Sequence, residues 1–108
     1  MTARAFILEN GRLSTDAAEE HAHRVFLYER LPNPLMPDKL LVELREKLIE
    51  YNFDPEADFL VLTGSPVHLA MMTLAAMDLS PWDKLNILVF DSRSDNYVAK
   101  EVALPCPS

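Results

Sequence analysis

The chain is poor in cysteine and glycine. Its 108 residues include one cysteine, Cys106, and two glycines, Gly11 and Gly64. A single cysteine excludes an intrachain disulfide and suits a reducing compartment, so we expect a cytoplasmic protein. Two glycines exclude the glycine triplet of dinucleotide-binding loops. No lysine follows Gly64 as it does in the phosphate loop of nucleoside-triphosphate enzymes.

The chain also lacks a basic cluster and a long apolar run. Ten Lys and Arg residues stand against 17 Asp and Glu residues, which gives a formal net charge of −7. Nucleic-acid binding needs a basic face that displaces phosphate counterions, so we expect no nucleic-acid partner. No stretch approaches the roughly 18 apolar residues of a membrane span, and residues 1–12 do not have the pattern of a secretory signal. We expect no membrane contact, and the acidic surface suits a basic partner protein.

What the chain does have is an alternation of apolar runs with turn residues, typical of an α/β domain. Runs rich in strand-forming residues predict strands, which lie at 4–9, 24–29, 58–63, 85–91 and 96–103. Apolar residues at steps of three and four predict two main helices, at 37–51 and 66–77, and a short helix is expected at 16–21. The uninterrupted apolar run in 58–63 is typical of an interior parallel strand.

The order of these elements predicts one domain over residues 1–108. We expect a mixed sheet of four to five strands with a central parallel β-α-β unit, a C-terminal β-hairpin and two main helices. Residues 1–36 form a strand-loop-strand region, 37–103 an α-β-α-β-β core and 104–108 a tail. The sequence leaves open whether the N-terminal strands join the same sheet.

The turn between the third predicted strand and the second main helix has two interpretations. Gly64 permits a sharp turn, Ser65 can cap the helix and Pro66 suits the first helical position, so helix initiation explains every residue. Alternatively, the free amides at this helix start bind an anion. The ligand-binding residues of that second interpretation are Thr63, Gly64, Ser65, His68 and Asp91.

The second main helix is apolar on all sides. Only His68 and Thr73 are polar between residues 67 and 77. Such a helix needs burial around its whole circumference, and any part that the sheet and the 37–51 helix leave uncovered would be an exposed apolar patch. The sequence therefore predicts either a sufficient second layer within the domain or a homodimer. The predicted interface residues are Met71, Met72, Thr73 and Ala76.

No catalytic, metal or cofactor site is expected. Glu19, Glu20, His21 and His23 are metal-ligand types, but their spacing does not match a known zinc motif. No nucleophile has an evident base beside it, because a capping Ser65 already commits its hydroxyl. The sequence favours a non-enzymatic protein.

Residues 54–77 contain, in order, an acidic turn, an apolar strand, a Gly-x-Pro motif and an apolar helix, and residues 85–102 form a closing hairpin that carries Asp91 and Tyr97. This C-terminal half resembles small uncharacterised α/β proteins of phages and their bacterial hosts. The resemblance implies an accessory or host-interacting role and no catalytic residues. We therefore expect a protein that acts through protein contacts. The alternative is a small-ligand or nucleotide/phosphate-binding domain, or a minor hydrolase, that uses the turn at Gly64 and Ser65.

Overall fold

The computed structural model describes residues 3–9 and 15–104. Five strands form one sheet in the order β2-β1-β3-β4-β5. The strands are β1 (Arg4–Glu9), β2 (His23–Tyr28), β3 (Phe59–Val61), β4 (Lys84–Asp91) and β5 (Asn96–Ala103). The first four run parallel, and β5 pairs antiparallel with β4 from Asp91↔Asn96 to Lys84↔Ala103. The predicted mixed sheet, parallel β-α-β unit and C-terminal hairpin are confirmed, and the N-terminal strand β1 is an interior strand of the same sheet, between β2 and β3.

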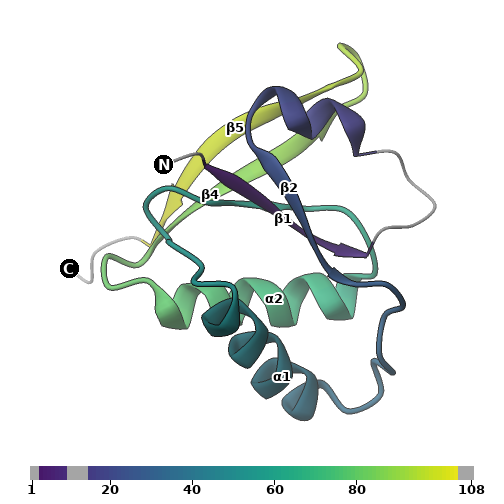
Figure 1. Ribbon diagram of the computed structural model, residues 1–108, viewed down its shortest axis with the longest axis vertical. Helices are drawn as coiled ribbons and strands as arrows, with labels where there is room; N and C mark the ends of the chain where they lie inside the picture. Colours follow the sequence, from purple (N-terminus) through teal and green to yellow (C-terminus); the bar gives the residue numbers. More distant parts are fainter. Residues whose placement is uncertain (1–2, 10–14, 105–108) are drawn as a thin grey trace.

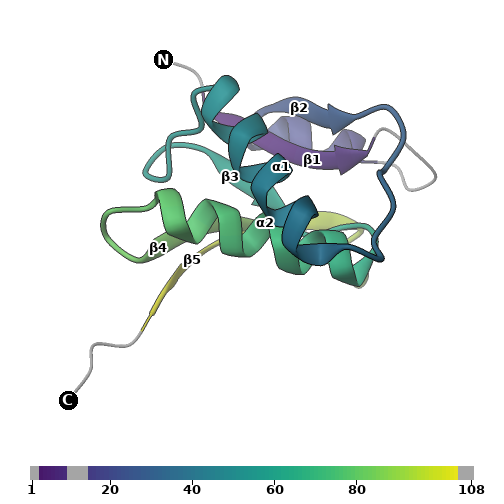
Figure 2. The ribbon, with the colours of Figure 1, turned by 90° about the horizontal axis from the view of Figure 1, so that it is seen from below.

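The helices divide between the two faces of the sheet. Both long helices, α1 (Pro37–Glu50) and α2 (Pro66–Leu79), lie on one face, and the short 3₁₀ helix η1 (Asp16–Glu20) lies on the other (Figures 1 and 2). The chain passes from β1 through η1 to β2, then returns across β1 through α1 to β3 and on through α2 to β4. The β1–β2 connection runs in one direction along the sheet, and the β2–β3 and β3–β4 connections run in the other. Because parallel crossovers are right-handed, η1 lies on one face and α1 and α2 lie on the opposite face.

Alternation along the strands produces two cores. On the α1/α2 face the buried side chains include Phe6, Leu8, Leu60 and Leu85, packed with the inner sides of both helices. On the η1 face the buried strand residues are Ala5, Ile7, Val61, Leu88 and Tyr97, which are smaller on average than those of the other face. Ala18 of η1 and Ala22 just after it pack against them. Strand β1 is buried on both sides, since successive strand residues point to opposite faces.

The sequence predicted the type and position of most helices and strands, but several of their ends differ in the structure. Strand β3 is only three residues long, Phe59–Val61, against the predicted 58–63. The Asp58 carboxylate accepts from the Arg4 amide at the start of β1, and beyond Val61 the Leu62 amide still donates to the Leu88 carbonyl of β4 at 3.3 Å. The predicted helix 66–77 extends to Leu79. The connection from α2 to β4 is a turn, with Asp83 at φ 53°.

Candidate functional site

The carboxyl ends of the neighbouring strands β1 and β3 lie side by side. At this point the connections leave the sheet in opposite directions. The chain leaves β1 toward η1 on one face and leaves β3 toward α2 on the other. In open α/β sheets the loops at such a point separate and leave a crevice, which is where these folds bind ligands. The order 2-1-3-4-5 is one of the two common doubly wound orders, although here β5 is antiparallel.

A cavity of about 680 Å³ opens at this end of the sheet. Its volume lies within the usual range of small-molecule sites. The walls come from η1, the β3–α2 turn, the start of α2 and the β4–β5 hairpin. The lining residues are Asp16, Ala17, Leu62, Thr63, Gly64, Leu69, Phe90, Asp95 and Tyr97. We call this cavity the switch-point cleft.

Gly64 gives the β3–α2 turn its shape. Its φ of +126° is a backbone conformation that side chains with a Cβ rarely adopt, and an added Cβ would lie 3.5 Å from Leu8 Cδ1. The predicted side-chain cap is absent, because Ser65 makes no capping hydrogen bond through its hydroxyl. Its backbone carbonyl instead accepts the first helical bond from the Leu69 amide at 2.9 Å.

The structure brings two of the five predicted ligand-binding residues into the cleft, Thr63 and Gly64. The His68 ring is buried, with Nε2 2.7 Å from the carbonyl oxygen of Pro32 and with no partner for Nδ1 among the described residues. Asp91 accepts hydrogen bonds from the Arg93 amide and the Ser94 hydroxyl within the hairpin turn. Ser65, His68 and Asp91 are not among the cleft's lining residues.

The aromatic wall of the cleft was not anticipated from the sequence. Phe90 and Tyr97 pair directly across the hairpin, and their rings meet edge to face with centroids 5.4 Å apart. Tyr97 is buried while Phe90 remains 43% exposed. Burial raises the pKa of the Tyr97 hydroxyl, so it stays protonated at neutral pH. The signal in the sequence was the hairpin register, since the tight turn between β4 and β5 places these two residues opposite each other.

The predicted interface residues lie mainly inside the chain. Met72 and Ala76 are fully buried in the core of the domain, Met71 is partly buried, and the Thr73 hydroxyl donates to the Leu69 carbonyl at 2.8 Å. The sheet and α1 thus cover the side of α2 that carries the predicted set. The large apolar side chains that α2 exposes are those of Val67 and Leu74.

The acidic segment around η1 is engaged in ion pairs rather than in a metal site. Arg24 contacts Asp16 at 3.0 Å and Glu19 at 3.1 Å, and its hydrogen bond holds the pKa of Glu19 below the ordinary value. Among residues 3–9 and 15–104, no group of three or more His, Cys, Asp or Glu side chains is placed to hold a metal ion. No helix within the same part of the chain has the length and apolar character to cross a membrane.

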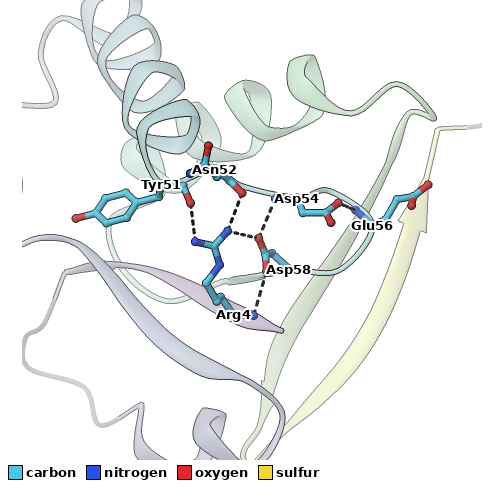
Figure 3. A network of polar contacts seen from close by, with 6 residues as sticks. All are labelled: Arg4, Tyr51, Asn52, Asp54, Glu56 and Asp58. Carbon is cyan, nitrogen blue, oxygen red and sulfur yellow. Dashed lines mark hydrogen bonds and ion pairs between the residues drawn. The ribbon is translucent and has the colours of Figure 1, made fainter. Parts of the chain in front are cut away.

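A second polar cluster lies at the opposite, amino end of β1 and β3 (Figure 3). The Arg4 guanidinium donates to the carbonyls of Tyr51 and Asn52 and to the Asp58 carboxylate. Asp58 also accepts from the amides of Arg4 and Asp54. Every partner shown is part of the chain, so the cluster connects the α1–β3 turn to β1.

Comparisons with known proteins found one matching family. No curated protein and no solved structure matches the chain. A family model described as phage Pam3 gp32-like protein matches residues 9–104, so the likeness is not limited to the C-terminal half on which the sequence resemblance was based. Because the match covers most of the chain, this protein belongs to the phage Pam3 gp32-like protein family.

Proposed function

We propose that the chain is a non-enzymatic accessory or host-interacting protein of phages that acts through protein contacts and forms a homodimer. Membership of a phage protein family supports the phage-related part of this function. The observation that carries the remainder is a set of exposed, large apolar side chains on the outside of the two long helices. A helix layer that ended in water would present polar residues there.

We call the exposed large apolar side chains of the two long helices, Val42, Ile49, Val67 and Leu74, the outer helix face. The ion pair of Arg45 and Asp78 lies beside three of them, Val42, Ile49 and Leu74. The Arg45 Nε and an Asp78 carboxylate oxygen are 2.7 Å apart, so α1 and α2 are adjacent at this point.

Helical spacing places the apolar residues beside that pair. On α1, Val42 lies three residues before Arg45 and Ile49 four residues after it. On α2, Leu74 lies four residues before Asp78. Residues three and four apart are neighbours on a helix surface.

The outer helix face is suited to a second copy of itself. A two-fold axis through the ion pair would pack α1 and α2 against the same helices of the partner and cover all four apolar side chains. Leu74 and Val42 are 54% and 57% exposed in one chain, which is high for residues of their size within a helix. The dimer would complete the burial that α2 requires on the side that the sheet and α1 leave open.

Light scattering of the wild type and of Leu74→Glu tests the homodimer. We expect a dimer mass for the wild type and a monomer mass with an unchanged circular dichroism spectrum for the variant, because a charge would be buried at the interface. The matched control is Val102→Glu on β5, where an equally apolar and 44% exposed side chain lies outside the outer helix face. A monomeric wild type at the highest soluble concentration would overturn the homodimer, and so would dissociation by Val102→Glu but not by Leu74→Glu.

A further inference from the structure

We propose that the switch-point cleft binds a small planar ligand that carries hydroxyl or amino groups and no phosphate. A nucleoside fits this chemistry best. The proposal is independent of the homodimer, because the cleft is formed at the carboxyl ends of the strands and the outer helix face is made of other residues.

The charges of the described cleft lining disfavour a phosphorylated ligand relative to an uncharged one. Two carboxylates, Asp16 and Asp95, are among the lining residues, and the described lining contains no Lys or Arg. Arg24 offsets the charge of Asp16 through an ion pair of 3.0 Å, whereas Asp95 forms no ion pair with any described residue. A phosphate in the cleft would face the Asp95 carboxylate, and two like charges at close range repel.

The same carboxylate recognises hydroxyl and amino groups. An ionised carboxylate is an acceptor only, so it pairs with ligands that donate. At the switch point of dinucleotide-binding sheets, an acidic side chain accepts the ribose hydroxyl in this way. The Thr63 hydroxyl adds a group in the same cleft that both donates and accepts.

The aromatic wall supplies the apolar part of the site. The Phe90 ring packs edge to face against the buried Tyr97, while 43% of Phe90 remains exposed. A partly exposed aromatic ring is a platform on which a base stacks, and such stacking tolerates every base because each has a π-face. Ala17, Leu62 and Leu69 complete an apolar enclosure around it.

Gly64 leaves the turn beside this wall without a side chain. Gly64 lines the cleft with its main chain, and a Cβ added to it would lie 3.5 Å from Leu8 Cδ1. A ligand can therefore approach the main chain closely at this point, which is one of the uses of glycine at binding sites.

Titration calorimetry of the full chain against four nucleosides, their 5′-monophosphates and tyramine tests the proposal. We expect at least one nucleoside or tyramine to bind, and each monophosphate to bind about tenfold more weakly than its nucleoside because of the like charge at Asp95. Binding of tyramine but of no nucleoside would identify the ligand class as aromatic amines. Binding of a nucleoside would identify the class that we favour. Absence of binding by every probe, or monophosphates that bind as tightly as nucleosides, would overturn the proposal.

Two variants locate the binding. Asp95→Asn keeps a residue that tolerates the φ of 54° and removes the charge, so it should reduce the preference for the nucleoside over its monophosphate severalfold. The matched control is Asp83→Asn, which makes the same change at φ 53° in a turn that does not line the cleft and should leave the preference unchanged. Equal effects of the two variants would place the ligand elsewhere.

Discussion

Asp58 and Arg4 connect the first residue of β1 to the residue before β3, although they are 54 positions apart in the sequence. The Asp58 carboxylate accepts from the Arg4 amide at 3.1 Å and from the Arg4 guanidinium at 2.9 Å. Asp58 is 3% exposed, whereas Arg4 remains 29% exposed. The pair fixes the register of two neighbouring parallel strands at their amino ends, where no tight turn could do so.

We expect Asp58→Ala to lower the free energy of unfolding by about 3 kcal/mol, the usual cost of removing one partner of a buried ion pair. Arg4→Ala should cost less, because the backbone amides of Arg4 and Asp54 still donate to the carboxylate. Urea denaturation of both variants measures the difference. An Arg4→Ala variant that lost more stability than Asp58→Ala would contradict this account.

Met72 and Leu74 are two residues apart on α2 and should respond differently to truncation. Met72→Ala removes a fully buried side chain and should lower the free energy of unfolding by about 3 kcal/mol. Leu74→Ala, at a protein concentration low enough to keep the chain monomeric, should change it by about 0.5 kcal/mol or less. Chemical denaturation checks both values, and comparable losses would mean that α2 lies in another orientation.

The β3–α2 turn should depend on its glycine and not on its serine. Gly64→Ala forces a Cβ into φ +126° beside Leu8 and should cost about 1–3 kcal/mol. Ser65→Ala should cost almost nothing, because the serine hydroxyl makes no capping bond. Thermal unfolding of the two variants distinguishes these roles. A loss in Ser65→Ala of the size seen for true helix caps, about 1 kcal/mol, would show that the hydroxyl does cap α2 in solution.

Acid should remove the contribution of Glu19. Its hydrogen bond and charge interaction with Arg24 lower the pKa of Glu19 in the folded chain below the ordinary value of 4.5. A lowered carboxyl pKa contributes stability above the ordinary value, and that stability is lost as the pH falls through the folded-state pKa. Glu19→Gln should therefore be less stable than the wild type at pH 7 and equally stable in strong acid.

Urea denaturation across this range measures the difference between the two proteins. Because Glu19 lies at the surface, the difference should be small and should shrink as salt is added. A gap that persists unchanged into strong acid would show that the ion pair is not its cause.

The sequence by itself determined the elements and the fold class. Steps of three and four in α1 placed Leu40, Leu44 and Leu48 on one side, and all three are buried. The β4–β5 hairpin followed from two strand-forming runs around a short polar turn. These features depend on residues near one another in the chain, where periodicity and turn chemistry decide the structure.

Only the tertiary structure decided which surfaces meet. Because α2 is apolar on all sides, its sequence did not indicate which side faces the core. Met72 is buried and Leu74 is exposed, although either side chain suits an apolar environment. Strand β1 became an interior strand of the sheet, between β2 and β3, through pairing with strands that follow it by many residues. The cleft gathers η1, the β3–α2 turn and the hairpin, and such long-range contacts are set by packing and crossover direction, which local sequence does not encode.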